Sequence, residues 1–292
     1  MPELPEVETL RLGLQKYVVG HKILDLEMAH PKIFQGDKND IIGSTIKNVK
    51  RVGKGLILEL SNGYCLAIHI KLTGQLIYSD EKTKDIPVST TKVGSVPNNF
   101  THVVFSLDKN AKLYYNDQRR FGWIKVVKSS EVNKLPFFRD MGPEPFVALG
   151  IESPDPLRDL SFSRFKFILS RKITKIKPAL MDQTNMGGVG NIYANDALFK
   201  AGISPMRSAK TLSDEEVKKL YDSLIAVLKK GFESHGASEL SFVNILGQEG
   251  EYQNHTLVYG KRGNECPNRC GGKIMFIKLA GRGTYYCPAC QL

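Results

Sequence analysis

Four of the five cysteines lie within the last 27 residues of the chain, and their spacing is that of a metal site. Three residues separate the first pair and two separate the second, with sixteen residues between the pairs, which is within the range of structural zinc sites. Four thiolates complete a tetrahedral shell, so such an ion holds a fold together and does not activate water. The alternative is four reduced thiols in a small hairpin, but 32 residues bury little core unaided. The sequence therefore predicts one structural Zn²⁺, held by Cys266, Cys270, Cys287 and Cys290.

The cysteine segment is also strongly basic. Residues 261–292 contain six Lys or Arg and one acid, a local charge of +5, within a chain of 292 residues that carries +11 overall. An excess of this kind predicts an acidic partner, with nucleic acid first among the candidates. The fifth cysteine, Cys65, stands in an apolar run and is expected in the core.

The extreme N-terminus offers a nucleophile. If Met1 is removed, Pro2 presents a secondary amine that can attack an aldehyde-like carbon, and its reference pKa of roughly 8 leaves a useful neutral fraction near pH 7. Glu3 stands beside it and could move protons. Proline at this position is also common without any function, and Glu6 and Glu8 could be simple first-turn charges of a helix.

Two further motifs could contact a polyanion. The run MGGVGNIYANDALF, residues 186–199, leads from a glycine-rich turn into a helix. Such a turn either binds a phosphate group at the start of the helix or simply connects two helices tightly. The run NDQRRFGW, residues 116–123, places two arginines before an aromatic residue at the end of a strand. That aromatic residue packs at a core edge or enters a DNA base step, and the local sequence does not decide between the two.

The elements that must position these residues differ between the two halves of the chain. The first 130 residues contain a helix beginning near Pro5 and then several short strands. One of these strands alternates through Leu24, Leu26 and Met28. A series of strands at this spacing predicts a sandwich or barrel. Residues 80–100 are polar and irregular, and we interpret them as a mobile surface insertion. The second half is helical, with a capping box from Ser213 to Glu216.

The chain is expected to be an α+β multidomain protein. The predicted divisions are an N-terminal β-sandwich over 1–130, a proline-rich linker over 131–157, a helical DNA-binding domain over 158–233, a loop region over 234–260 and a zinc ribbon over 261–292. The ordinary composition argues against a disordered or fibrous protein. No apolar run is long enough for a membrane span, and the N-terminus does not resemble a secretory signal, so a cytoplasmic protein is expected.

Taken together, these motifs resemble the formamidopyrimidine-DNA glycosylase family over nearly the whole chain. They occur in register as MPELPEVET, VGKGLILEL, HIKLTGQL, DQRRFG, KIKPALMDQ, GVGNIYANDALFKAGISP, VYGKRG and GRGTYYCPACQ. The resemblance implies a β-sandwich with an N-terminal helix, a helix–two-turn–helix domain and a zinc finger. It also implies a monomeric base-excision repair enzyme that binds damaged double-stranded DNA, extrudes an oxidised purine and nicks the strand, with no membrane partner.

The resemblance implies four catalytic roles. Pro2 would attack the sugar C1′ and form a Schiff base, and Glu3 would donate and shuttle protons at the sugar. Lys54 would donate a proton during β-elimination, and Arg282 on the zinc finger would contact phosphate and assist δ-elimination.

The resemblance also implies a set of substrate and DNA contacts. Glu6 would line the lesion pocket, three side chains would fill the gap left by the flipped nucleotide, and others would contact the DNA. The loop over about 234–259 would cap the lesion and is expected to be poorly ordered without DNA. The gap-filling residues are Leu72, Arg119 and Phe121, the phosphate contacts are Lys172 and Asn191, and the other contacts are His69, Tyr259 and Lys261.

The sequence departs from the family pattern at four places. The first cysteine pair, CPNRC, has one residue more than the usual spacing, and Gln118 replaces a proline. Leu72 replaces a methionine of similar volume, and Phe100 replaces a histidine that contacts phosphate. None of these departures falls on the four catalytic positions.

Two other functions compete with this interpretation. A related glycosylase of the endonuclease VIII type acts on oxidised pyrimidines, but it usually has glycine where this chain has Leu4. The other alternative is a catalytically silent relative, or a zinc-ribbon module that only binds DNA. Covalent chemistry at Pro2 distinguishes an enzyme from the silent forms.

Overall fold

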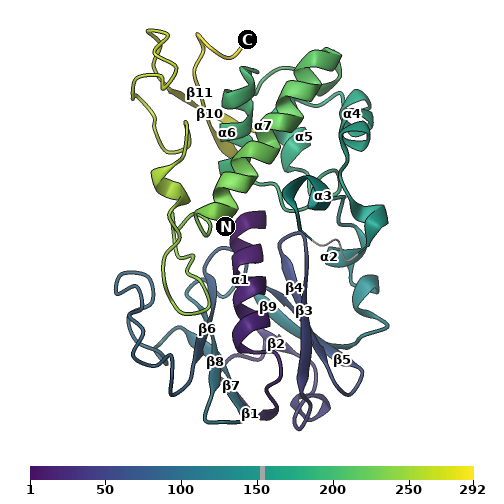
Figure 1. The fold of residues 1–292 in the computed structure, drawn as a ribbon, viewed down its shortest axis with the longest axis vertical. Coiled ribbons are helices and arrows are strands. Elements are labelled where there is room, and N and C mark those ends of the chain that lie inside the picture. The colour runs from purple at the N-terminus through teal and green to yellow at the C-terminus, as the bar shows by residue number, and fades with distance from the viewer. Residues whose placement is uncertain (152–154) are drawn as a thin grey trace. The chain divides into compact units, whose positions relative to one another are not determined.

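The chain forms two compact units, shown in Figure 1. The structure is a computed structural model that describes residues 1–151 and 155–292. The first unit comprises Met1–Arg139 and Phe232–Gln253, and the second comprises Asp140–Gly231 and Asn254–Leu292. Residues 152–154 of the predicted linker lie outside the described residues.

The first unit is a β-sandwich with an N-terminal helix. One sheet has four strands in the order β1-β7-β8-β6, and the other has five in the order β2-β9-β5-β4-β3. Its helices are α1 (Leu4–Tyr17) and α2 (Pro136–Arg139). Its strands are β1 (Ile23–Met28), β2 (Phe34–Gln35), β3 (Ile46–Val52), β4 (Gly55–Leu60), β5 (Tyr64–His69), β6 (Gly74–Ser79), β7 (Thr101–Leu107), β8 (Lys112–Asp117) and β9 (Trp123–Lys128).

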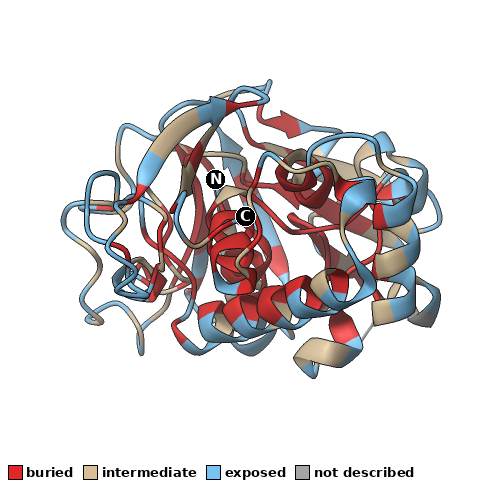
Figure 2. Ribbon diagram, turned by 90° about the horizontal axis from the view of Figure 1, so that it is seen from above, coloured by how far each residue is buried: buried red, intermediate tan, exposed pale blue. Residues whose placement is uncertain are grey.

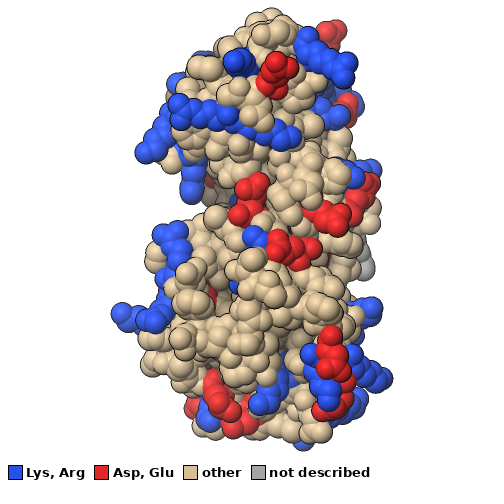
Figure 3. All heavy atoms as spheres, turned by 90° about the vertical axis from the view of Figure 1, so that its left-hand side faces the viewer, with Lys and Arg blue, Asp and Glu red and all other residues tan. Residues whose placement is uncertain are grey.

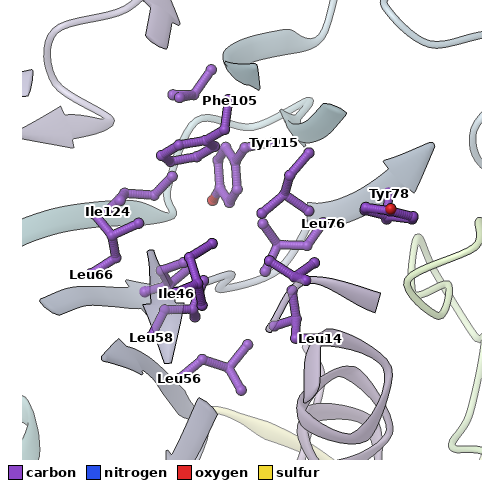
Figure 4. Close-up of a cluster of buried hydrophobic side chains, with 14 of the residues drawn as sticks. Leu14, Ile46, Leu56, Leu58, Leu66, Leu76, Tyr78, Phe105, Tyr115 and Ile124 are labelled. Atoms are coloured by element: carbon purple, nitrogen blue, oxygen red, sulfur yellow. The ribbon is translucent and has the colours of Figure 1, made fainter. Parts of the chain in front are cut away.

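The core of this unit joins the two sheets and α1. Val7, Leu10 and Leu14 of α1 are buried in the same apolar cluster as side chains of both sheets. Figure 4 shows Leu14 in this cluster, together with Leu56 and Tyr115. The burial of this face fixes the helix against the sandwich, and with it the N-terminal residues that precede the helix.

The first strand corrects one prediction. Leu24 and Met28 were expected to share the face of Leu26, but their exposed fractions are 51% and 39%, whereas Leu26 and Ile23 are buried. The pairing of β1 with β7 shifts register between Ile23 and Asp25. This irregularity changes which side chains face the core, as a shift in strand register does.

The segment over residues 80–100 and the loop over 234–253 both pack on the sandwich. Val93 is buried in a small cluster with Ile77, Tyr114 and Val243, and Val243 belongs to the loop. Ile245 of the same loop is part of the main core. The mobility expected of these two segments stays a prediction, and the structure shows that both contribute buried apolar side chains to the sandwich.

The second unit contains the predicted helices and a two-stranded hairpin. The expected capping box is present before the long helix, because the Ser213 amide donates to Glu216 Oε2 at 2.8 Å and the Glu216 amide donates to Ser213 Oγ at 3.2 Å. Figure 2 shows helices with buried inner faces and exposed outer faces. The elements are α3 (Phe146–Leu149), α4 (Phe162–Ser170), α5 (Ile176–Met181), α6 (Asn191–Ala201), α7 (Asp214–Glu233), β10 (Met275–Leu279) and β11 (Arg282–Tyr286).

The helices α5 and α6 and the turns between them build the helix–two-turn–helix arrangement. Gln183 closes these turns, since its side chain donates to the Val189 carbonyl at 2.7 Å and accepts from the Gly188 amide at 3.1 Å. Gly202 ends α6 in the left-handed conformation with φ of 73°, as the sequence predicts. Within the described residues, no helix is both long enough and apolar enough to cross a bilayer.

Candidate functional site

The first turn of α1 is fixed by the carboxylate of Glu6. Glu3 is the N-cap residue, and its backbone amide donates to Glu6 Oε2 at 2.6 Å, while the Glu3 side chain accepts from the Glu6 backbone in a reciprocal capping box. The other Glu6 oxygen, Oε1, accepts from the Ala237 amide at 2.7 Å. Pro2, Glu3 and Glu6 are all buried. One carboxylate therefore ties the residue next to Pro2 to the loop over 234–253.

The second buried carboxylate of α1 anchors the turn that carries Lys54. Glu8 Oε2 accepts from Arg51 Nε at 2.7 Å, and the side chains are 4% and 1% exposed. Arg51 Nη1 then donates to the carbonyl of Gly53 at 3.0 Å, in the two-residue turn between β3 and β4. Gly53 has φ of 58°, the left-handed region that glycine favours at the start of such turns. Lys54, the next residue, is 4% exposed.

The charge state of Glu8 follows from these partners. Burial alone would raise the pKa of the carboxyl, but the charges and hydrogen bonds of Arg51 and Arg11 outweigh burial and hold the pKa of Glu8 below its usual value. The carboxylate therefore stays ionised at neutral pH, and the ion pair with Arg51 persists.

His69 is a buried neutral imidazole at the end of β5. Burial, together with the positive charges of Lys71 and Lys54, lowers the pKa of His69 to about 3. Its Nδ1 accepts from the Lys71 amide at 2.9 Å, which places the ring proton on Nε2. The ring packs edge-on against Phe137, with centroids 4.7 Å apart. At neutral pH the residue is therefore an uncharged hydrogen-bonding group near Lys54.

The turn that carries Arg119 and Phe121 is organised by one buried carboxylate. Asp117 Oδ1 accepts from Thr73 Oγ1 at 2.5 Å and from the Arg119 amide at 3.2 Å, and Oδ2 accepts from the Gly122 amide at 2.7 Å. The Arg119 guanidinium lies 4.7 Å from the centre of the Phe121 ring, and Phe121 is 52% exposed. The turn thus presents a stacked cation and aromatic ring to solvent.

The third predicted gap-filling residue, Leu72, adjoins the same network. Its neighbour Thr73 donates to Asp117, and the carbonyl of Leu72 accepts from Ser241 Oγ at 3.1 Å. Leu72 therefore contacts the loop over 234–253 through its backbone while its side chain is half-buried. The site residues that belong to the first unit are Pro2, Glu3, Glu6, Lys54, His69, Leu72, Arg119 and Phe121.

In the second unit, α6 connects its own N-terminus to the zinc hairpin. Asn191 is the first residue of α6, and its carbonyl accepts from Asn195 Nδ2 at 2.6 Å. The side-chain oxygen of Asn195 then accepts from the Tyr285 amide of β11 at 2.8 Å. Arg282 is exposed at the start of β11. Lys172, in the turn after α4, is half-buried.

A buried aspartate on α6 fixes the segment that leads into the finger. Asp196 is fully buried, and its carboxylate accepts from the backbone amides of Leu257, Val258 and Tyr259 at 2.9, 3.0 and 3.2 Å. The Tyr259 ring lies against Tyr285 with centroids 5.2 Å apart. Lys261 Nζ donates to the Thr256 carbonyl. The predicted contacts Tyr259 and Lys261 therefore belong to one ordered turn beside β11.

The four finger cysteines converge on one point. Their sulfur atoms all lie within 4.8 Å of one another, with Cys266 and Cys290 at 3.5 Å and Cys270 and Cys287 at 3.6 Å. Zinc–sulfur bonds of about 2.3 Å in a tetrahedron place the sulfurs roughly 3.7 Å apart, so this donor set fits Zn²⁺. The extra residue of CPNRC is absorbed in a turn in which Arg269 has φ of 54°.

The finger presents its positive charge at the surface. Five of the six basic residues over 261–292 are exposed, namely Arg262, Arg269, Lys273, Lys278 and Arg282. Figure 3 shows Lys and Arg side chains over the upper part of the view, with a few acidic side chains among them. A surface of this charge suits a phosphate backbone.

Comparison with known proteins assigns the family. Matches to family descriptions cover residues 1–124 (formamidopyrimidine-DNA glycosylase N-terminal domain), 152–242 (H2TH domain of the same glycosylase) and 263–292 (zinc finger found in FPG and IleRS). A formamidopyrimidine-DNA glycosylase of Pelotomaculum thermopropionicum is 38% identical over 297 aligned positions, which cover 100% of this chain and 99% of the relative. The chain belongs to the formamidopyrimidine-DNA glycosylase family.

Solved structures of this glycosylase family share the fold. A Lactococcus lactis FPG mutant in complex with DNA containing Fapy-dG matches with a TM-score of 0.84 and 33% identity, covering 99% of each chain. The Lactococcus lactis Fpg in complex with DNA containing an abasic site matches with a TM-score of 0.82 and 33% identity, also covering 99% of each chain. In this family member the four cysteines form the zinc-finger site.

Sequence motifs missed several residues that build the glycosylase site. Arg51, Asp117, Asn195 and Asp196 had no predicted role, although each orders a segment that carries predicted site residues. Glu8 was interpreted as a possible surface charge of the first turn, yet it is buried in an ion pair. The position of Glu8 at the edge of the apolar face of α1, beside Val7, is a sequence signal that an acid lies close to the core.

The neutral state of His69 makes a prediction for pH. The imidazole has a pKa near 6.5 when unfolded and about 3 when folded, so its contribution to stability is complete above pH 6.5 and declines as the pH falls toward 3. His69→Asn keeps an acceptor for the Lys71 amide but does not titrate. Urea unfolding at pH 7, 5.5 and 4.5 should show the wild type losing stability more steeply than the variant. Parallel losses in the two proteins would contradict a buried neutral imidazole.

The cysteine cluster makes a prediction for metal content. Elemental analysis should find about one zinc per chain in the wild type, since four thiolates complete one site. Cys290→Ser should lose most of the metal and lower the thermal stability, because metal binding and finger folding are coupled. The control is Cys65→Ser, because Cys65 is buried in the first unit and is not one of the four clustered cysteines, so this variant should keep the zinc. Full zinc content in Cys290→Ser would rule out this ligand set.

Proposed function

We propose that this chain is a bifunctional DNA glycosylase and AP lyase of base-excision repair. It removes oxidised purines, such as formamidopyrimidines and 8-oxoguanine, from damaged double-stranded DNA and then nicks the strand by β,δ-elimination. Its family membership and the relatives solved with Fapy-dG and abasic DNA support this proposal. We infer that it works as a monomer in the cytoplasm.

The observation that carries the proposal is the capped N-terminus of α1. A nucleophile at the end of a chain is useful only if the end is held in place, because a frayed terminus samples many positions. Here Pro2 is buried and is followed by Glu3, whose backbone amide is fixed by Glu6 at 2.6 Å. Removal of Met1 leaves the Pro2 nitrogen as a secondary amine at a rigid position.

The reaction then begins at the sugar of the damaged nucleotide. The base must first leave the duplex, at a cost of a few kcal/mol, because the reacting carbon is not accessible in the stack. The Pro2 nitrogen attacks C1′, the glycosidic bond breaks and the base departs with its bonding electrons. Glu3 supplies a proton at the sugar as the ring opens, and the product is an iminium ion between Pro2 and C1′.

The iminium ion acts as the electron sink for strand cleavage. Loss of a proton from C2′ expels the 3′ phosphate, and a second elimination expels the 5′ phosphate. Lys54 serves as the proton donor of the first elimination, in a turn fixed by Arg51. Arg282 of the finger binds phosphate and assists the second elimination. The buried neutral state of His69 adds no second positive charge beside Lys54.

The remaining predicted residues hold the DNA open. Leu72, Arg119 and Phe121 fill the gap left by the extruded nucleotide, and the exposed Arg119–Phe121 stack is suited to insertion between bases. Contacts to the DNA backbone and nearby groups come from His69, Lys172, Asn191, Tyr259 and Lys261. Leu4 of the LPEVET run favours the purine enzyme over the endonuclease VIII type, because the latter usually has glycine at that position.

Covalent trapping tests the proposal directly. Borohydride reduces the iminium ion, so the wild type incubated with duplex DNA containing 8-oxoguanine opposite cytosine should form a stable protein–DNA adduct. Pro2→Gly, or protein that retains Met1, should lose most of this adduct because the nucleophile is changed or blocked. Pro5→Ala, in the first turn of α1, is the control and should trap normally.

The outcomes separate the alternatives. Trapping only on oxidised pyrimidines would favour the endonuclease VIII type. Binding without trapping on any lesion or on abasic DNA would favour a silent DNA-binding relative. Undiminished trapping by protein that retains Met1 would exclude Pro2 as the nucleophile.

A further inference from the structure

We propose that the segment over residues 80–100, between β6 and β7, is a positioning element that clamps the loop over 234–253 onto the lesion pocket. The clamp holds that loop on Glu6 and Leu72 before DNA is bound. This inference rests on the proposed function, because it takes the loop to cap the lesion, Glu6 to line the lesion pocket and Leu72 to fill the gap left by the extruded nucleotide. All of these residues belong to the first unit, and Figure 1 shows the descending loop beside the connection that follows β6.

The first layer of the clamp is a close backbone contact. The Ser89 amide donates to the carbonyl of Gly247 at 2.8 Å. A Cβ built on Gly247 would lie 2.7 Å from a methyl group of Val88, and the φ of Gly247 is 76°. Both observations require glycine at this point of the loop, because any larger residue would push the two segments apart.

The second layer is a charged network. Ser89 Oγ donates to Glu249 Oε1 at 2.6 Å, and Lys92 Nζ lies 3.7 Å from Glu249 Oε2. The same ammonium group donates to the carbonyl of Leu240 at 2.9 Å. Lys92 is 15% exposed and therefore reaches two points of the loop from a largely buried position. One lysine thus joins both ends of the loop.

The third layer connects the clamp to the sandwich. Gln75 of β6 is buried, and its Nε2 donates to the carbonyl of Lys92 at 3.0 Å and to the carbonyl of Ser241 at 2.7 Å. Val93 packs with Val243 of the loop in the small apolar cluster. A single side-chain amide therefore bridges the clamp segment and the loop.

The loop also contacts two residues that are proposed to meet the substrate. The Ala237 amide donates to Glu6 Oε1 at 2.7 Å, and Ser241 Oγ donates to the carbonyl of Leu72 at 3.1 Å. The same loop therefore contacts both the clamp and two residues proposed to contact the substrate. Releasing the clamp should loosen the loop, and the binding of a damaged base should then have to order it.

The variant Ser89→Ala/Lys92→Met tests the clamp in the full-length protein. Hydrogen exchange in the free protein should become faster at the amides of residues 236–250, by roughly tenfold or more, because local opening no longer breaks the charged contacts. Excision of a formamidopyrimidine or 8-oxoguanine base should fall, mainly through a higher KM. Strand nicking at a preformed abasic site should change less than about twofold, since no base remains for the loop to cap.

Two matched variants serve as controls. Lys84→Met removes a lysine from the same segment, where it pairs with the neighbouring Glu81, and should leave exchange and excision unchanged. Lys92→Arg keeps the positive charge and the hydrogen-bond donors, and it should retain most of the excision activity of the wild type. Unchanged exchange over 236–250 in Ser89→Ala/Lys92→Met, or an equal loss of nicking on abasic DNA, would overturn the clamp. An enzyme that is inactive on every lesion would contradict the proposed function. Hydrogen exchange is measured without DNA, so it would still show whether the clamp holds the loop.

Discussion

The geometry of the first unit depends on a buried ion pair between Glu8 of α1 and Arg51 of β3. Their atoms are 2.7 Å apart and their side chains are almost fully excluded from solvent. Burying two charges is costly, and such a pair is often no more stable than apolar residues of the same volume. The pair is better explained by what it positions, because Arg51 also holds the carbonyl of Gly53 beside Lys54. It joins the helix that follows the proposed nucleophile to the turn that carries the proposed proton donor.

A second carboxylate on the same helix extends this arrangement to the loop. Glu6 accepts one hydrogen bond from the amide of Glu3 and another from the amide of Ala237. Any movement of the loop over 234–253 therefore changes the surroundings of the residue next to Pro2. The helix α1 therefore has three structural roles. Its apolar side chains fill the core, Glu6 fixes the N-terminus, and Glu6 and Glu8 connect α1 to the loop over 234–253 and to β3.

Local patterns predicted what depends on neighbouring residues. The zinc cysteines, the capping box of Ser213 and Glu216, and the closure of α6 by Gly202 each need only a short stretch of chain. Contacts between distant segments were not predictable in this way. Arg51 lies 43 residues from Glu8, and Ala237 lies 231 residues from Glu6. The exposure of Leu24 was missed because an irregularity in strand pairing leaves no local signal. The motif resemblance supplied residue roles, and the structure supplies the contacts that hold those residues.

The most direct test of the account is to replace the ion pair by apolar side chains, which leaves Arg11, the other and partly exposed partner of Glu8, to be solvated. The double variant Glu8→Met/Arg51→Met should fold, with an unfolding free energy within about 2 kcal/mol of the wild type, because apolar side chains substitute for a buried pair at little cost. It should nevertheless nick abasic DNA on the order of tenfold more slowly, with β-elimination after Schiff-base formation as the slowed step, since Lys54 loses its anchored turn. Nicking at the wild-type rate by a folded double variant would contradict the central role of the ion pair.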